Sequence, residues 1–555
     1  MTNKMSFHEK IFDSPAYEKC AVKIVEFYFD IIVARVARAM CRSNTCGMQL
    51  LCTVTKLPRK QVSNCLHILI QHNLAVMELP SGSHPTYNIL KWNVLYLMRR
   101  HNYVHHVRGE MGVEAELVLD HLLGAGWASA SQIIVTTSTK LAMIASPDTG
   151  GSVTDYHIRV RNEMSKLVEQ HCILRCSSEV KQQSFHQNCI LPTLQDDDDQ
   201  PRLQYIFPSD ILDLSALKRE VESRICSNDE NGSLAIKLPQ RTNYPDAHIL
   251  WTINYDTFHL HWRNSYLIRT VTSRIGTECG EVLSALLKST ATTLQDKWQS
   301  DLYVTTTQMR QSLPHSNHLD HCLTLLENET GGALRRLGIG GGGGEYNFDV
   351  ATYVLYLNIE FVAKSVKEKF GSNAARIFRL VQQKSMMSGE VLAKRCYMDM
   401  KECDQLSNVL LQHRYIFVHD LRKPSIPSYN ARDLLYKANF LEVVRMMARQ
   451  CFVEVYNIMQ KRELLFAANK SLMEKKTRVD AILNNIRSAA SAEQIQEVEE
   501  ALSQTEREAI SKWQKNQEDM LTVIEGLCDD MFLFELYLRY HPCLDNPNTG
   551  RRTQS

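Results

Sequence analysis

A segment that recurs three times along the chain constrains its fold more than any other feature. Each copy has apolar residues at helical spacing, then Gln-His, one further residue and a short apolar run. The spacing predicts an amphipathic helix with one face on a core, and the final run predicts a strand. The copies cover 65–76, 164–174 and 406–418. Such internal repetition predicts a series of similar small domains.

The first copy shows what the whole unit contains. Pro58 lies in a turn just before a helix, where its missing N–H costs nothing. A turn rich in Pro, Gly and Ser then separates two short strands. The expected helices are 17–40, 48–55 and 60–72, and the expected strands are 74–79 and 86–90. Helices followed by a hairpin in this order form a winged helix, with the hairpin as its wing.

The last third of the chain changes character. Four apolar residues spaced by seven form a heptad seam, which we expect to bind a partner: Leu465, Leu472, Val479 and Ile486. After an interruption at Ser488–Ser491, a second apolar pattern runs on to Leu538. Two long helices with a short joint predict an antiparallel coiled-coil hairpin.

We therefore predict a mainly α protein with four tandem winged-helix domains, each with a small β-wing, and a C-terminal antiparallel coiled coil. A polar stretch that includes Asp196–Asp199 cannot bury enough apolar surface to order itself, which predicts a linker. The expected boundaries are winged helices at 10–95, 105–180, 246–349 and 350–430, the linker or acidic loop at 181–245, and the hairpin at 433–540.

The charge balance limits the possible partners. The 555 residues include 63 Lys and Arg and 62 Asp and Glu, a net charge of +1, so the chain is neither a basic nucleic-acid coat nor a polyacidic chain. No apolar run is long enough to span a membrane, and the first ten residues contain no apolar core of a secretory signal. The 16 cysteines form no C-x-x-C pair, which fits a reducing compartment.

Motifs for catalysis are missing. The chain has no phosphate-binding P-loop, zinc-protease or nucleophile-elbow signature, and the glycine run 338–344 lacks the Lys-Ser/Thr that would contact phosphate. His259 and His261 are two apart and point to different helix faces. His318 and His321, with His315 nearby, are the densest set of metal-ligand types. We predict no enzyme, cofactor, metal or small-molecule substrate, and read His72, His171 and His413 as equivalent helix caps.

Basic residues gather at the expected helix-turn-helix segments, where a winged helix meets DNA. The candidate DNA-binding residues are Lys56, Arg59, Lys60, Arg376, Arg379, Lys384, Lys394 and Arg395. Glu402 and Asp404 on the last helix of the fourth unit would repel phosphate. We therefore expect protein contact as the main role, with non-specific or single-stranded DNA contact beside it.

Several longer stretches carry a family resemblance: Gln71–Leu74, Trp251–Arg263, Phe370–Leu380 and Lys475–Val479. Through them the chain resembles the family of the largest subunits of the peripheral heterotrimer of DNA-directed RNA polymerase III. The resemblance implies a nuclear, non-enzymatic scaffold that docks on the clamp of the largest polymerase subunit. It also implies two smaller heterotrimer partners and a role in initiation and promoter opening at small untranslated-RNA genes.

Two other functions fit winged helices with a coiled coil. A sequence-specific DNA-binding regulator would dimerise through the coiled coil and contact base edges. A scaffold of another assembly, such as a protein-degradation or translation complex, would use the same modules for docking. Partner composition distinguishes all three.

Overall fold

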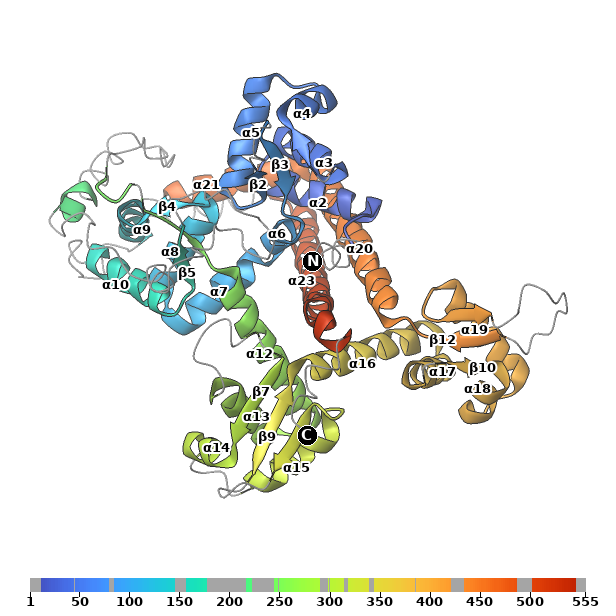
Figure 1. The fold of residues 1–555 in the computed structure, drawn as a ribbon. Coiled ribbons are helices and arrows are strands. Elements are labelled where there is room, and N and C mark those ends of the chain that lie inside the picture. The colour runs from blue at the N-terminus through green and yellow to red at the C-terminus, as the bar shows by residue number, and fades with distance from the viewer. Residues whose placement is uncertain are drawn as a thin grey trace. The chain divides into compact units, whose positions relative to one another are not determined.

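The computed structural model describes 11–43, 45–78, 84–144, 156–176, 216–221, 244–247, 249–289, 298, 300–313, 318–338, 344–384, 386–420, 434–486 and 502–545. The chain divides into two compact units, and their helices and strands are labelled in Figure 1. One comprises Ala21–Arg263, and the other comprises Met1–Cys20 with Asn264–Ser555. Most of the predicted linker, including Asp196–Asp199, lies outside the described residues, as does most of the glycine run.

The first winged helix lies in the Ala21–Arg263 unit. Its elements are α3 (Ile31–Arg42), β1 (Cys46–Gly47), α4 (Met48–Thr55), α5 (Arg59–Gln71), β2 (Ala75–Glu78) and β3 (Thr86–Ile89). The sheet order is β1-β3-β2. The single helix predicted for 17–40 was wrong, because α2 (Pro15–Tyr28) ends before Asp30. The Asp30 backbone is extended, and its carboxylate accepts the Ile31 N–H at 2.7 Å, so α3 begins anew there.

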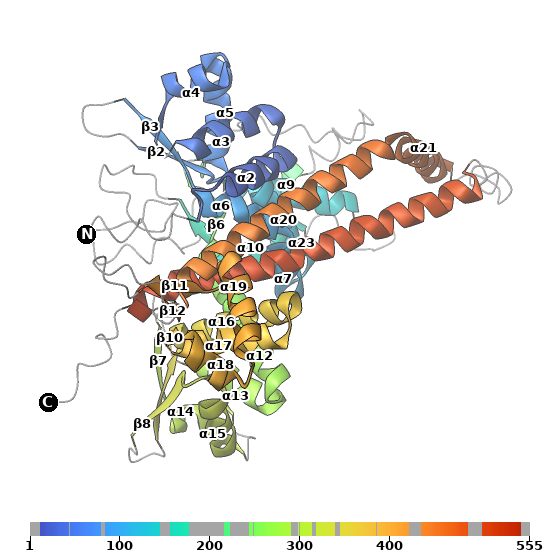
Figure 2. The same ribbon diagram turned by 90° about the vertical axis from the view of Figure 1, so that its right-hand side faces the viewer.

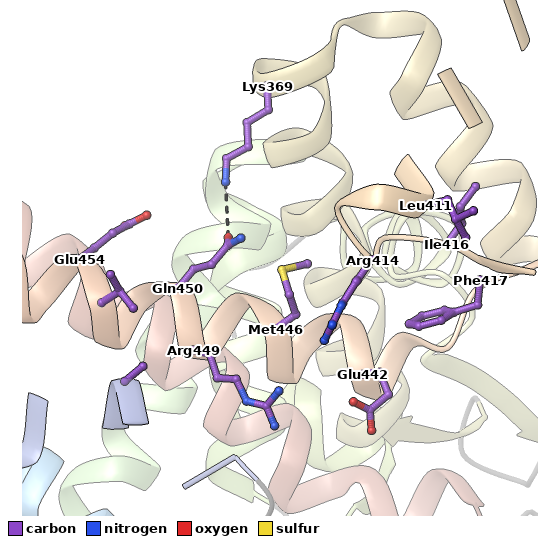
Figure 3. Close-up of a pocket in the computed structure, with 12 residues that line it drawn as sticks. Lys369, Leu411, Arg414, Ile416, Phe417, Glu442, Met446, Arg449, Gln450 and Glu454 are labelled. Carbon is purple, nitrogen blue, oxygen red and sulfur yellow. Dashed lines mark hydrogen bonds between the residues drawn. The ribbon is translucent and has the colours of Figure 1, made fainter. Parts of the chain in front are cut away.

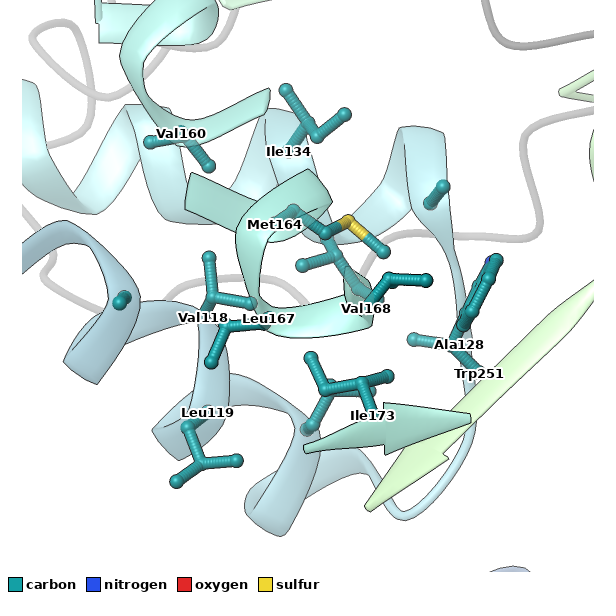
Figure 4. Packing of buried hydrophobic residues seen from close by; sticks show 14 of the residues in the cluster. Val118, Leu119, Ala128, Ile134, Val160, Met164, Leu167, Val168, Ile173 and Trp251 are labelled. Carbon is teal, nitrogen blue, oxygen red and sulfur yellow. The ribbon is translucent and has the colours of Figure 1, made fainter. Parts of the chain in front are cut away.

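The second three-stranded sheet of this unit joins segments far apart in sequence. Its helices are α8 (Val113–Ala125), α9 (Ala130–Ile144) and α10 (Tyr156–Glu169), and its strands β4 (Ala128–Ser129), β5 (Ile173–Arg175) and β6 (Leu250–Ile253). The predicted boundary at 246 stays a prediction, but β6, which follows it, pairs with both β4 and β5. Trp251 on β6 is fully buried among the helices (Figure 4).

The same helix ending follows α5 and α10, and it recurs after α19 (Met400–Gln412). Asn73, His171 and Arg414 have φ of 56°, 60° and 61°. In the first copy the Leu74 N–H reaches the Leu69 carbonyl, and the Asn73 N–H reaches Ile70, which is a Schellman motif. The other two copies have the same bonds. His72 and His413 are C-cap residues, but His171 lies one position later, so its predicted equivalence was wrong.

The other unit contains two more three-stranded sheets, ordered β7-β9-β8 and β10-β12-β11. The first has β7 (Asp301–Thr305), β8 (Leu334–Gly338) and β9 (Glu345–Asp349), with α13 (Thr277–Ser289), α14 (Thr306–Ser312) and α15 (Leu319–Glu329). The second has β10 (Met387–Ser388), β11 (Phe417–Asp420) and β12 (Leu434–Lys437), with α16 (Val350–Phe370), α17 (Ser372–Gln383), α18 (Gly389–Cys396) and α19 (Met400–Gln412).

A helical hairpin completes this unit. It comprises α20 (Phe440–Ala468), α21 (Lys470–Ile486) and α23 (Gln504–Asp545), and α20 and α23 lie side by side (Figure 2). The end of α23 is apolar and buried around Phe534, where α16 packs on it. Asn358 of α16 is fully buried and donates to the Leu533 carbonyl at 3.2 Å. Within the described residues, no helix is both long and apolar enough to cross a membrane.

Candidate nucleic-acid and partner surfaces

The three predicted cations of the first winged helix lie together on its helix-turn-helix. Lys56 is the C-cap of α4, with φ of 56°, and this left-handed residue turns the chain toward α5. Pro58 precedes α5, and Arg59 and Lys60 occupy its first turn. All three cationic side chains are exposed. They can therefore contact phosphates without any change in the fold.

Two of the cations predicted for the fourth winged helix already have partners in the fold. Arg376 of α17 donates to the Cys396 carbonyl at the end of α18, at 2.9 Å. Arg379 pairs with Glu360 of α16 at 3.1 Å. Lys394 and Arg395 lie exposed in the last turn of α18, and Lys384 is exposed at the end of α17. The bond from Arg376 to Cys396 brings α17 and the end of α18 together, but it also occupies part of a predicted phosphate ligand.

One exposed aromatic residue was missed by sequence reasoning. Tyr397 follows α18 with φ of 52° and is 92% exposed. It holds the same place in its domain as Lys56 in the first, because both are left-handed C-cap residues between the two helices. The sequence gives no sign of this, since left-handed backbone is uncommon for a bulky side chain.

The predicted heptad seam lies partly within the hairpin. Val479 is buried, while Leu465 and Leu472 are half-buried. Ile486 ends α21, and its side chain is outside the described set. A salt bridge of 2.7 Å from Lys475 to Glu506 joins α21 to α23. The predicted partner-binding role of the seam stays a prediction.

Other large apolar side chains of the hairpin face solvent. Leu464 is 70% exposed, Phe466 52% and Ile482 45%. The Phe466 ring lies 6.4 Å from the ring of Trp513 on α23. Leu464 directly precedes the predicted seam residue Leu465, so the seam and an exposed apolar surface occupy adjacent positions on α20. The periodicity of apolar residues in the sequence did not distinguish the seam positions from the exposed apolar positions.

A groove of about 830 Å³ lies between α20 and the α19–β11 turn (Figure 3). Phe417, Met446 and Val453 supply apolar walls, and Arg414 and Glu454 supply charge. Lys369 donates to the Gln450 side chain across one edge at 3.5 Å. The groove thus combines apolar walls with charged groups of both signs.

The histidines singled out in the sequence have structural surroundings where they are described. His259 is buried, and its Nε2 lies 2.9 Å from the Tyr103 hydroxyl. Burial, together with the charge of Arg100, lowers the pKa of His72 to about 4. Asp320 pairs with Arg310 at 3.4 Å, and His315 lies outside the described residues. In the described part of the chain, no three His, Cys, Asp or Glu side chains gather to hold a metal.

Four family models match separate stretches of the chain. They are the RNA polymerase III subunit RPC82 helix-turn-helix domain at 19–76, RNA polymerase III subunit RPC82 at 162–351, the POLR3C C-terminal winged-helix domain at 362–436, and the helical hairpin domain of DNA-directed RNA polymerase III subunit RPC3 at 471–533. The helix-turn-helix match spans Lys56, Arg59 and Lys60, and the hairpin match spans Leu472 and Val479.

Curated relatives align along nearly the whole chain. DNA-directed RNA polymerase III subunit RPC3 of Rattus norvegicus is 24% identical, over 94% of this chain and 97% of its own length. The subunits named RPC3 from Mus musculus and Homo sapiens are 25% and 24% identical over the same shares. The winged helices, the hairpin and these matches agree, and the chain belongs to the RPC3 (RPC82) family of RNA polymerase III subunits.

Proposed function

We propose that the protein is a non-catalytic scaffold subunit of nuclear RNA polymerase III. It docks on the clamp of the largest polymerase subunit, together with the two smaller subunits of a peripheral heterotrimer. From there it supports initiation and promoter opening at small untranslated-RNA genes. The observation that carries the proposal is the match to RPC3 subunits over 94% of the chain.

The architecture we propose for this role is four tandem winged helices and an antiparallel coiled coil, with the domain boundaries predicted above. The four three-stranded sheets support the count. The packing of α20 along α23, with the Lys475–Glu506 bridge, supports pairing within one chain. A regulator that dimerises through the coiled coil would instead need these apolar faces for a second copy.

Nucleic-acid contact is the second part of the proposal. The exposed cations at the helix-turn-helix of the first domain support non-specific or single-stranded DNA contact. Base reading is disfavoured in the fourth domain, because Glu402 lies in the first turn of α19. Phosphate contact positions a protein on DNA and carries no sequence information.

Affinity purification of the tagged chain from nuclear extract tests the assembly. Proteins that remain bound at moderate salt are identified by mass spectrometry. We expect the polymerase III subunits in near-equal amounts with the bait. Recovery of the bait alone, as a dimer that selects one duplex sequence, would support the regulator, and recovery of another assembly would support a different scaffold.

A further inference from the structure

One stretch of the chain departs sharply from the overall charge balance. Residues 31–77 contain no Asp or Glu, although the whole chain has 62 of them. The same stretch contains six cationic residues: Arg35, Arg38, Arg42, Lys56, Arg59 and Lys60. It covers α3, α4, α5 and most of β2 of the first winged helix. The near-neutral net charge of the whole chain therefore does not exclude a strongly positive stretch within this domain.

The three arginines of α3 form a row. Spacings of three and four place Arg35, Arg38 and Arg42 on one helical face. The opposite face is buried against the domain through Val33, Val36 and other apolar residues. All three arginine side chains are exposed. The row rises about 10 Å along the helix, over which a DNA duplex carries about six phosphate charges.

The two carboxylates at the ends of this stretch, Asp30 and Glu78, already accept hydrogen bonds. Asp30 accepts the Ile31 N–H at 2.7 Å as the cap of α3. Glu78 accepts from the Asn88 side chain at 2.9 Å. The matching region of the predicted fourth winged helix differs. Arg379 pairs there with Glu360, Glu390 lies in the first turn of α18, and Asp399 and Glu402 lie at the start of α19. The two helix-turn-helix surfaces therefore differ in charge despite their common fold.

The stretch also indicates which form of nucleic acid it fits. Residues 31–77 contain no Phe, Tyr or Trp. Single-strand binding surfaces stack bases on aromatic rings, whereas a duplex backbone requires only cations at suitable spacing. A stretch with exposed cations and no aromatic residue of its own is therefore suited to the duplex backbone.

We propose that the first winged helix holds the phosphate backbone of duplex DNA through two basic rows, one on α3 and one at the α4–α5 turn. This rests on the proposed nucleic-acid contact and deepens it, since it assigns the contact to one domain, to the duplex, and to α3 arginines outside the helix-turn-helix turn. The contact is independent of sequence, because it involves phosphates alone.

Fluorescence anisotropy of the full chain with a labelled duplex, and with one of its strands, tests the assignment across about 50 to 200 mM salt. The variant R35Q/R38Q removes two cations of the α3 row and keeps good helix formers. K512Q/K515Q is the matched control, because both lysines are exposed on α23 among acidic residues. R376Q/R379Q tests the fourth domain in the same way.

We expect R35Q/R38Q to reduce the salt slope of duplex binding by about two, and to weaken binding roughly eightfold per lost contact at 0.1 M salt. The triple variant K56Q/R59Q/K60Q should reduce it further, and K512Q/K515Q should leave it unchanged. R376Q/R379Q should reduce it less than R35Q/R38Q does, because Arg376 and Arg379 already have partners in the fold. Circular dichroism and melting of each variant verify that it folds as the parent does.

Three results would overturn the assignment. One is an unchanged slope for R35Q/R38Q when the parent chain binds the duplex, and a second is a parent chain that binds only the single strand. The third is loss of polymerase subunits from R35Q/R38Q with duplex binding intact, which would make the α3 row a protein interface. Recovery of polymerase subunits by the parent chain is scored separately, so failure here leaves the proposed scaffold role standing.

Discussion

Asn73 carries more structural contacts than its position at a helix end suggests. Its φ of 56° closes the Schellman motif after α5. Its side chain donates to the Thr252 hydroxyl at 3.1 Å and accepts from the Trp127 indole at 3.2 Å, so it joins the first domain to the second within their unit. Gly126 of the second domain packs closely at the same contact. A Cβ at this position would lie 2.2 Å from the Gln71 carbonyl oxygen, so a larger residue does not fit there.

Replacing Asn73 by Ala should destabilise the Ala21–Arg263 unit by about 2–4 kcal/mol. About 1–2 kcal/mol comes from left-handed backbone, and the remainder from the partly buried Trp127 N–H that loses its acceptor. Arg414→Ala is the matched change at an exposed copy of the same position, and it should alter stability by less than about 1 kcal/mol, because the residue keeps a Cβ on left-handed backbone. Urea unfolding followed by tryptophan fluorescence and helicity measures both. Equal effects at the two sites would show that the side-chain contacts contribute nothing.

At the scale of elements, the repeat predicted the winged helices because each needs a core stripe at helical spacing before a strand. It did not predict that β6 would reach its sheet from beyond residue 245, since strand pairing at long range has no local signal. It also aligned His171 with His72, although the shared feature is the left-handed residue and not the Gln-His pair.

Among the candidate site residues, exposure of Lys56, Arg59 and Lys60 followed from the predicted turn. The bond from Arg376 to a carbonyl and the exposure of Tyr397 did not, because both depend on how α17 and α18 meet.

The hairpin contains a carboxylate whose protonation should affect stability. The pKa of Asp530 is raised from 3.8 to about 6. Partial burial is the main cause, and the negative charges of Asp529 and Glu454 add to it. The folded state thus binds a proton more tightly than the unfolded state, and this group's contribution to stability falls as pH rises from about 4 to 6. Asp530→Asn should therefore stabilise the hairpin by about 1 kcal/mol at pH 7, reduced by solvent screening, and by nothing near pH 3.5. Thermal unfolding of variant and parent at both pH values measures the difference, with Asp519→Asn, an exposed change on the same helix, as control. A gain of the same size at both pH values would exclude the ionisation as its cause.

For the whole molecule, two kinds of surface belong to two different units of the chain. The positive surface of the first winged helix contains no carboxylate between residues 31 and 77, while the hairpin exposes large apolar side chains. Cations exposed to solvent attract polyanions over a Debye length, whereas apolar groups act only when a partner removes them from water. We therefore expect that DNA contact and subunit assembly can be lost independently.

The variant L464Q/F466Q tests this separation from the assembly side. Both side chains are more than half exposed, so the fold should tolerate glutamine, which forms helix well. If a polymerase subunit covers them, recovery of polymerase III subunits should fall at least tenfold, since burying each of two such side chains contributes about 1.5–3 kcal/mol. The salt slope of duplex binding should stay at the parent value. V113Q/I158Q makes the same kind of change at exposed apolar positions of α8 and α10, and should retain both activities. Undiminished recovery by L464Q/F466Q would remove this part of the hairpin from the assembly interface, and a parallel loss of DNA binding would show that the two functions share one surface.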